Sequence, residues 1–450
     1  MMKWVFQARR WRRAGLGLLL ASLPLSAVPA AVAQGGGSFT ESQPSKPKKH
    51  ALPERPTDKP SQPPALSFPV APLGFTAPGA LYLGQRNALA SLDFLDENRL
   101  LFTFRVPGLI HRDKTGSDGG EERQIRAVLL DLPAGTIEAE ALWSVHDRGR
   151  YLWMLNDGRF LLRDRDGLSL GDASLELKPF LRFPGPLLWL ELDPNQQFIV
   201  TNSRESSAAQ KPGQVSSPAS ASAEMSVDEQ NSAAPPDTVV RILRRDSGKV
   251  MLVSRVRSTV HLPINSEGYL ESLRANGAQW LVNLNYFSGG STVLGRVNST
   301  CSPVFNFISQ REVLVDACSP GGGRELMAMA TDGLHLWEDT SSATPIWPLL
   351  SMAPDGSRLV RETLAVSHTV SASSPLYSED IKGQVVEVLD AADGKVALKT
   401  MASPVLDAGG NVAISPSGRR VAVVNAGAIQ VFELSAPPPL PPAATSPPGR

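Results

Sequence analysis

The sequence predicts an all-β fold assembled from small antiparallel sheets. Between residues 66 and 434, runs of 5–8 apolar or alternating residues are separated by Asp, Asn, Pro and Gly, which is the spacing of strands and turns. No stretch of 12 or more positions shows the apolar stripe of a helix. The chain has 450 residues, 42% of them hydrophobic, so it can bury a large core and we do not expect wholesale disorder.

A repeating unit accounts for this pattern: an apolar strand, a turn, a second apolar strand, and one or two further strands. The clearest copies lie at 349–364 and 412–424, and looser copies lie earlier, for instance at 142–155. One residue marks the first turn of each copy, and these residues are Asp96, Asp147, Pro194, Asn276, Ser309, Asp355 and Pro416. Their spacings are 51, 47, 82, 33, 46 and 61 residues, and removing a 31-residue insertion reduces 82 to 51. Seven units of this length predict a single β-propeller with seven blades of four antiparallel strands.

Two details of this propeller are predicted separately. The spacing of 33 residues leaves room for only three strands in the fourth unit, so we expect that blade to lack an outer strand. The last unit has three strands and then stops in proline, so its fourth strand must come from the N-terminal part, from 66–72 or 80–84. The alternative is an open array of β-meanders with unpaired edges.

The fragments APDGSRLV (353–360) and ISPSGRRVAVVNAGAIQVFEL (414–434) resemble the repeats of WD40-like and YVTN-like β-propellers of secreted bacterial proteins. The resemblance covers residues 66–434 and implies the fold, not a function. The Gly-His and Trp-Asp signatures of eukaryotic WD40 repeats are absent, so the scaffold role of that branch is not implied.

The ends of the chain differ from the repeats. Residues 1–33 have the layout of a secretory signal peptide: basic residues up to Arg13, an apolar stretch, and small residues at 31–33 before the cleavage point. An uncleaved membrane anchor is the alternative. We therefore expect a secreted or periplasmic protein with no membrane span after signal removal. Low-complexity segments are a disordered linker at 34–65, a disordered insertion at 206–236 and a Pro-rich tail at 435–450.

Charge and composition exclude several partners. Lys+Arg and Asp+Glu are 44 each, but the signal peptide holds five of the bases and no acid, which leaves 39 against 44, a formal charge of −5. A protein that binds nucleic acid by neutralising phosphates is basic, so we expect no nucleic-acid partner. Two cysteines are too few for a zinc ribbon or an iron–sulfur cluster, and the six histidines are scattered singly. The tryptophans lie in or beside apolar runs, where blade packing explains them, so we expect no cofactor and no metal.

The two cysteines predict a disulfide. If Ile308 faces Arg311 across a hairpin, opposed residues have numbers that sum to 619, and Cys301 and Cys318 also sum to 619. Directly opposed residues are within bridging distance, and export to an oxidising compartment favours the bond. Closing a loop of about 16 residues stabilises a fold by roughly 3 kcal/mol in the chain-entropy model.

Three connections between second and third strands are predicted to be long, and they emerge on one face of a propeller. They are 106–125 in the first unit, 203–237 in the third and 365–383 in the sixth, whereas Asn156-Asp-Gly in the second is minimal. The candidate ligand-binding residues in these loops are His111, Arg112, Glu121, Glu122, Arg123, Arg204, Glu205, His368, Tyr377, Glu379 and Asp380. We expect 106–125 and 365–383 to form one side of a polar site and 206–236 to be a surface insertion.

Together these features predict an exported β-propeller that acts as a binding module for a protein or glycan partner in the cell envelope or outside the cell, without covalent catalysis. The alternative is a propeller enzyme, either a quinoprotein-like dehydrogenase or a hydrolase or lyase of sugar-related substrates. A third possibility is a spacer-tethered structural component of the envelope.

Overall fold

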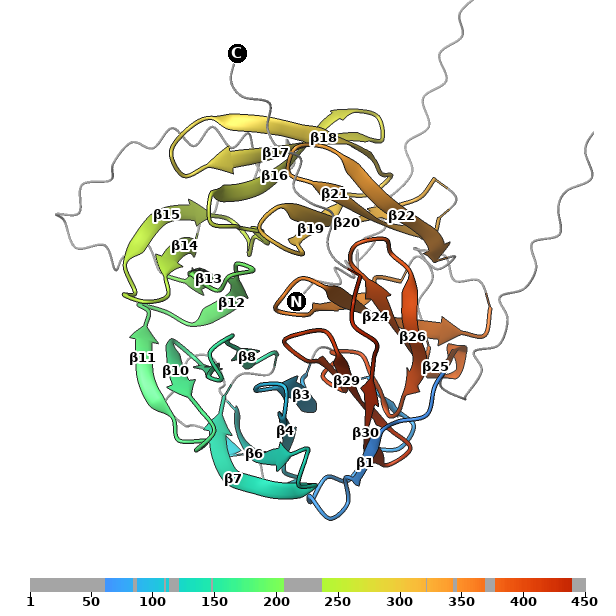
Figure 1. Cartoon of the computed structure of the whole chain (residues 1–450). Coiled ribbons are helices and arrows are strands. Elements are labelled where there is room, and N and C mark those ends of the chain that lie inside the picture. The colour runs from blue at the N-terminus through green and yellow to red at the C-terminus, as the bar shows by residue number, and fades with distance from the viewer. Residues whose placement is uncertain are drawn as a thin grey trace, which may run out of the picture. The chain divides into compact units, whose positions relative to one another are not determined.

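The computed structural model describes residues 61–83, 87–108, 111–112, 121–146, 149–205, 237–320, 322–342, 346–368 and 377–438. All of them belong to one compact unit, Pro56–Arg450. Its strands form seven antiparallel sheets, which are the blades of a ring (Figure 1). Among the described residues the helical content is the 3-10 turn η2 (Ser378–Asp380) alone, and no helix there is long and apolar enough to cross a membrane. The predicted seven-bladed β-propeller is confirmed.

In each blade the strands run in order from the centre of the ring to its rim, as β12 and β15 show in Figure 1. Blade 1 consists of β3 (Ala90–Phe94), β4 (Arg99–Arg105), β6 (Glu121–Asp131) and β7 (Thr136–Val145), and blade 2 of β8 (Leu152–Met154), β9 (Phe160–Asp164), β10 (Gly167–Gly171) and β11 (Lys178–Arg182). Blade 3 consists of β12 (Leu187–Leu192), β13 (Phe198–Arg204), β14 (Thr238–Arg244) and β15 (Val250–Val256), and blade 4 of β16 (Gly268–Asn276), β17 (Gln279–Tyr286) and β18 (Ser291–Asn298).

The remaining blades complete the ring. Their strands are β19 (Val304–Phe307), β20 (Glu312–Cys318), β21 (Arg324–Ala330) and β22 (His335–Ser342) in blade 5; β23 (Leu349–Met352), β24 (Arg358–Val366), β25 (Ile381–Asp390) and β26 (Val396–Ala402) in blade 6; and β28 (Val412–Ile414), β29 (Arg420–Asn425), β30 (Ala428–Glu433) and β1 (Leu66–Pro69) in blade 7.

Blade 7 closes the ring, because its outermost strand comes from the N-terminal part of the unit. β1 pairs antiparallel with β30, with Leu66 opposite Val431. Of the two predicted candidates, 66–72 therefore supplies the strand. The other candidate contributes β2 (Leu81–Tyr82), which pairs in parallel with β27 (Val405–Leu406). The open array of meanders is excluded.

The apolar core lies between neighbouring blades, and the alternation of side chains along each strand decides which neighbour a residue contacts. In β4, Leu100 and Phe102 belong to the cluster shared with blade 7, whereas Leu101 belongs to the cluster shared with blade 2. All three are fully buried. Burying one such side chain stabilises the fold by roughly 1.5–3 kcal/mol, so these clusters hold the blades together.

The Asp-Gly turn of blade 6 shows why turn residues recur at this position. The Oδ1 atom of Asp355 accepts a hydrogen bond from the backbone N–H of Ser357 at 2.9 Å. Gly356 has a φ of +75°, and a Cβ atom there would lie 3.0 Å from the carbonyl oxygen of Ile308 in blade 5. Glycine is required both for this backbone conformation and for the close approach of the two blades.

The predicted repeat at 142–155 is wrong. β7 ends at Val145 and pairs with β6, whereas β8 begins at Leu152 and pairs with β9, so the segment is a link between two blades rather than a hairpin. The marker Asp147 lies outside the described residues. The first turn of blade 2 is at 156–158. A link and a hairpin both join two apolar runs by polar residues, which is why the pattern did not separate them.

Blade 4 has three strands, as predicted, but the missing strand is the innermost one, not an outer one. The segment before β16 takes the inner position and makes one bridge, from Ile264 to Tyr269. In blade 6, the N–H after the third strand, that of Ala391, donates to the carbonyl oxygen of Ser357 in the first turn. In blade 4 the N–H of Phe287 donates in the same way to the carbonyl oxygen of Glu267, so residues 265–267 are the first turn of that blade. Pro263 has no N–H to donate, which explains why no regular strand forms there.

The disulfide between Cys301 and Cys318 is confirmed, with a Cα–Cα distance of 5.5 Å. The hairpin register behind the prediction is off by one, because Val304 lies opposite Asp316 and opposed residues sum to 620. The turn has three residues, Ser309–Arg311, rather than two, so Cys301 lies before β19 and not within it. Ser299 joins the segment before β19 to the end of β20, because its Oγ accepts the N–H of Cys318 at 2.9 Å.

The termini and the insertion are untested. The predicted signal peptide, most of the linker at 34–65, the insertion at 206–236 and most of the tail lie outside the described residues. Residues 61–62 of the predicted linker are described and contact blades 6 and 7: the N–H of Ser61 donates to the carbonyl oxygen of Lys399 at 2.8 Å, and Gln62 Nε2 donates to that of Glu433 at 3.0 Å. The signal peptide and its cleavage stay predictions.

Candidate functional site

We call the upper face the side of the ring where the second and third strands of each blade are connected, and the lower face the opposite side. The three connections predicted to be long are the longest on the upper face, between β4 and β6, β13 and β14, and β24 and β25. The minimal connection predicted at 156–158 is on the lower face instead, and the upper connection of blade 2 is Arg165-Asp166. The upper face is therefore asymmetric, because the connections of blades 1, 3 and 6 are longer than those of the other blades.

The upper connection of blade 1 contains a short ribbon. β5 (His111–Arg112) pairs antiparallel with the start of β6, so that His111 lies opposite Glu122 and Arg112 opposite Glu121. This pairing extends the blade beyond the end of β4. Four of the predicted residues thus lie on two adjacent strands.

The upper connection of blade 6 is organised around Asp380. Its Oδ2 atom accepts the backbone N–H of Tyr377 at 2.9 Å, and its Oδ1 atom lies 3.6 Å from Nδ1 of His368. The same Nδ1 atom is 3.1 Å from Oγ of Ser367. The side chain of His368 and the residue Tyr377 are each 57% exposed, and the carboxylate bonds the backbone of Tyr377 rather than its ring. Glu379 lies beside them in η2.

Two predicted residues are structural instead. Glu205 is buried, and its carboxylate accepts hydrogen bonds from both Nη atoms of Arg241 at 2.6 and 2.8 Å. Burial alone would raise the pKa of Glu205, but Arg241 and the hydroxyl of Ser203 more than offset it, so the pKa is lowered. Arg123 is also buried, and its Nη2 atom donates to Oδ1 of Asn87 at 3.0 Å. Neither side chain is available to a ligand.

The predicted residues do not all meet. Arg204 is exposed at the root of the blade 3 connection, 3.4 Å from Asp237, far along the ring from the other two loops. Blade 7, whose upper connection is only 426–427, lies between blade 1 and blade 6. The two loops flank blade 7 on one face, and their predicted role as one site stays a prediction.

Sequence analysis missed a set of polar clusters between blades. Each contains an acid that stands alone inside an apolar strand, in the fragments SLDFL, LWLEL, VLVDA and LVRETL, and these acids are Asp93, Glu191, Asp316 and Glu362. A charge in such a position must be paired or neutralised. A single acid inside an apolar strand was therefore the sequence feature that could have indicated these clusters.

Glu362 is neutralised. Its Oε2 atom accepts a hydrogen bond from Nε2 of Gln384 at 2.5 Å. The Oε1 atom of Gln384 in turn accepts a hydrogen bond from Nδ2 of Asn411 at 2.9 Å. Burial raises the pKa of Glu362 to about 8, because only an uncharged amide faces it. At neutral pH the group is a carboxylic acid between blades 6 and 7.

Glu191 is paired. Its Oε2 atom lies 3.0 Å from Nδ1 of His261, and Nε2 of His261 lies 2.6 Å from the carbonyl oxygen of Phe305 in blade 5. Burial would raise the pKa of Glu191, but His261 and Trp189 lower it. Burial would lower the pKa of His261, but Glu191 and the Phe305 carbonyl raise it. The pair is ionised and connects three consecutive blades.

The other two acids are intermediate cases. Burial raises the pKa of Asp93 to about 6, against the opposing effects of Arg150 and of the Ser91 hydroxyl. The pKa of Asp316 is also raised to about 6, because the effect of burial exceeds the opposing effect of Arg324, whose Nη2 atom donates to Oδ1 of Asp316 at 2.5 Å.

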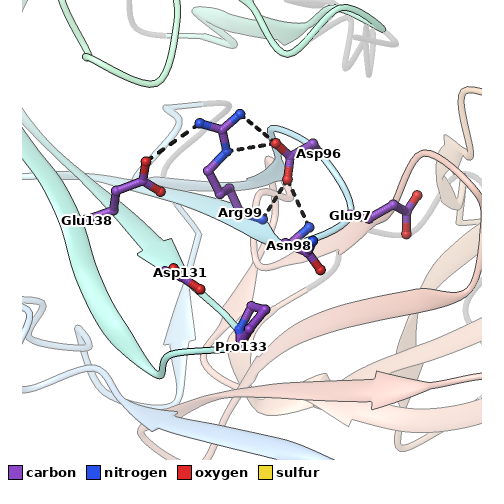
Figure 2. A pocket seen from close by; sticks show the side chains of 7 residues that line it. All are labelled: Asp96, Glu97, Asn98, Arg99, Asp131, Pro133 and Glu138. Atoms are coloured by element: carbon purple, nitrogen blue, oxygen red, sulfur yellow. Dashed lines mark hydrogen bonds and ion pairs between the residues drawn. The ribbon is translucent and has the colours of Figure 1, made fainter.

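A pocket of about 480 Å³ lies on the lower face of blade 1 (Figure 2). Arg99 lies between Asp96 at 2.6 Å and Glu138 at 3.6 Å. Asp96 also accepts two backbone N–H groups of its own turn, and Glu97 accepts the N–H of Ser417 in blade 7 at 2.6 Å. These side chains stabilise the turn and its junction with blade 7, so the pocket offers few free groups to a ligand.

His261 and His368 are not arranged as the base of a catalytic triad. A Ser-His-Asp triad places the hydroxyl and the carboxylate on different nitrogens of the ring. At His368 both Ser367 and Asp380 approach Nδ1, and at His261 both nitrogens are occupied. Among the residues that the structure describes, no group of three His, Cys, Asp or Glu side chains is placed to hold a metal ion.

No family model and no curated protein matches the sequence. Similar solved structures include Sqt1 of Chaetomium thermophilum bound to the N-terminus of ribosomal protein L10, 10% identical with a TM-score of 0.42, over 78% of this chain and 98% of that one. Another is the acylaminoacyl peptidase of Pyrococcus horikoshii, 9% identical with a TM-score of 0.42, over 75% and 48%. A third is the β-propeller domain of the trilobed protease of Pyrococcus furiosus, 10% identical with a TM-score of 0.42, over 77% and 94%. At this similarity they carry no argument about function.

Proposed function

We propose that this chain is an exported binding module, and that its upper face holds a protein or glycan partner through the connections of blades 1 and 6. The observation that carries the proposal is the inequality of the upper connections: three are long, whereas those of blades 2 and 7 have two residues each. Long connections on a rigid sheet framework are where recognition is usually located.

The connection of blade 6 supports this role because it exposes an aromatic ring and an imidazole next to a backbone segment that Asp380 holds. Asp380 fixes the backbone at Tyr377 and approaches His368, while the side chain of His368 and the residue Tyr377 are each 57% exposed. A backbone held in this way loses less conformational entropy when a partner binds. Tyrosine is also enriched among the residues that dominate binding energy.

The test is a comparison of loop variants. In two variants the connections between β4 and β6 (106–120) and between β24 and β25 (367–380) are each replaced by an Asn-Gly turn, and in a matched control the insertion at 206–236 is deleted. Glycan arrays and fractionated envelope proteins are screened with the wild type, and the dissociation constant of each purified ligand is then measured with all three variants.

We expect each replacement to weaken binding by tenfold or more, a loss of about 1.4 kcal/mol or greater, with the thermal unfolding midpoint unchanged. The control is expected to bind like the wild type. A ligand that both replacement variants bind with unchanged affinity would place the binding surface elsewhere and refute the proposal.

A further inference from the structure

The outer strand of blade 3 differs from the other outer strands. A strand at the edge of a sheet has unpaired N–H and C=O groups, and proteins protect such edges with charged residues or proline. Six of the seven described outer strands carry such a residue in an exposed position; these residues are Glu138 in β7, Lys178 in β11, Arg296 in β18, Glu338 in β22, Lys399 in β26 and Pro69 in β1. β15 is the exception.

The exposed residues of β15 are apolar. Val250, Met251 and Val253 are 43%, 48% and 56% exposed. Its single charged residue is half-buried, and this residue, Arg255, points to the upper end of the blade, where Nη1 donates to the carbonyl oxygen of Glu205 at 3.2 Å. β15 pairs with β14 on one side, and no described strand pairs with its other edge. It lies at the rim of the ring (Figure 1).

We propose that β15 is an interface between two copies of this chain, and that it pairs antiparallel with β15 of a second copy about a two-fold axis at Val253. Pairing of this kind joins the four-stranded sheets of two blades through main-chain hydrogen bonds. It removes the unprotected edge in both copies at once.

The occupant is a second copy because of the charge pattern. A strand that pairs with β15 comes to lie against Val250, Met251 and Val253, so an exposed charge on it would lose water without gaining a partner. Among the described outer strands only β15 itself lacks an exposed charge or a proline.

The two-fold arrangement also avoids repulsion between the copies. With Val253 on the axis, Val253 faces its counterpart and Met251 faces Arg255 of the second copy, so the two arginines are not opposed. The interface is isologous and closes after two copies, which gives a dimer rather than a fibre. The connections of blades 1 and 6 are not part of it, so a dimer would present two upper faces to a multivalent partner.

The first experiment measures the oligomeric state of the exported protein by sedimentation velocity over a series of concentrations. We expect a reversible monomer–dimer equilibrium in the wild type and a monomer in Val253→Lys, because the lysines of two copies would meet at the axis. Leu142→Lys is the matched control: Leu142 is 61% exposed on the outer strand β7, so this variant should dimerise like the wild type.

The second experiment does not depend on how a charge is tolerated. The only two cysteines of the chain are joined to each other, so Val253→Cys introduces the one free thiol. Residues opposed in an antiparallel pair have Cα atoms about 4.5–5.5 Å apart, within the range of a disulfide. Mild oxidation should therefore give a covalent dimer with Val253→Cys and not with Leu142→Cys. A wild type that is monomeric at every concentration, a Val253→Lys variant that dimerises normally, or equal cross-linking of both cysteine variants would overturn the proposal.

Discussion

Glu362 and Glu191 are carboxyl groups within apolar strands, Glu362 buried on the second strand of blade 6 and Glu191 16% exposed on the innermost strand of blade 3. Gln384 and Asn411 surround Glu362, and burial raises its pKa to about 8. His261 and Trp189 face Glu191, whose pKa is lowered in spite of burial. Burial acts on both acids, and the difference indicates that a cationic partner offsets its effect on the pKa whereas an amide does not. Amide partners produce a neutral hydrogen-bonded acid, and an imidazole produces an ion pair.

The largest expected effect comes from Glu362→Gln. A carboxyl group whose pKa is raised on folding makes the protein less stable at high pH. The free energy of unfolding decreases as pH rises from the pKa of the unfolded state, near 4.5, to that of the folded state, about 8. The complete loss is at most roughly 5 kcal/mol, at 1.36 kcal/mol for each pKa unit. We expect the variant to be more stable than the wild type by about 3 kcal/mol at pH 9 and equal to it at pH 5, in urea unfolding.

The matched control for this change is Glu176→Gln, since Glu176 is an exposed glutamate. It should follow the wild type at both pH values. If Glu362→Gln instead destabilises the protein at pH 9, the fold stabilises the ionised carboxylate, its pKa is not raised, and the contrast with Glu191 disappears.

The same chemical change at Glu191 should have the opposite sign. Glu191→Gln removes the charge that faces His261 and leaves a mostly buried imidazolium without its counter-ion. Breaking a buried ion pair costs 3–5 kcal/mol, but the ring of His261 is 31% exposed, so we expect a loss of about 2 kcal/mol at pH 6. Urea unfolding of the two glutamine variants side by side checks the comparison. Stabilisation by both would show that neither acid has an ionic partner.

Much of the fold could be predicted because its signals are local. Turn residues such as Asp355 and Pro416, between short apolar runs, mark the blades, and the proline that ends the last unit requires a closing strand from the N-terminal part. Errors arose where two local patterns look alike: the link around Asp147 has the pattern of a hairpin, and Asn276 marks the second turn of blade 4 rather than its first. With Ser266 in that place, the spacing to Ser309 becomes 43 residues.

The polar clusters could not be predicted in the same way. The contacts that decide them join residues distant in sequence: Glu191 with His261, or Gln384 with Asn411. Which acid meets which partner depends on how successive blades pack, and a single strand does not contain that information. The lengths of the upper connections were predictable because insertion of residues between two strands is visible in the chain itself. Whether the connections of blades 1 and 6 contact each other could not be predicted, because it depends on the position of blade 7 between them.

The smallest expected effect concerns His261, and its sign follows from both ring nitrogens. Nε2 donates to the carbonyl oxygen of Phe305 and Nδ1 donates to Glu191, so the folded state holds the imidazolium and its pKa is raised. A raised pKa contributes stability that is complete below the unfolded value of about 6.5 and is lost as pH rises through the folded value. His261→Gln should therefore lose about 1 kcal/mol more at pH 6 than at pH 9. Urea unfolding at the two pH values measures it. An equal loss at both would mean that His261 acts through packing alone, and that the charge of Glu191 has another source.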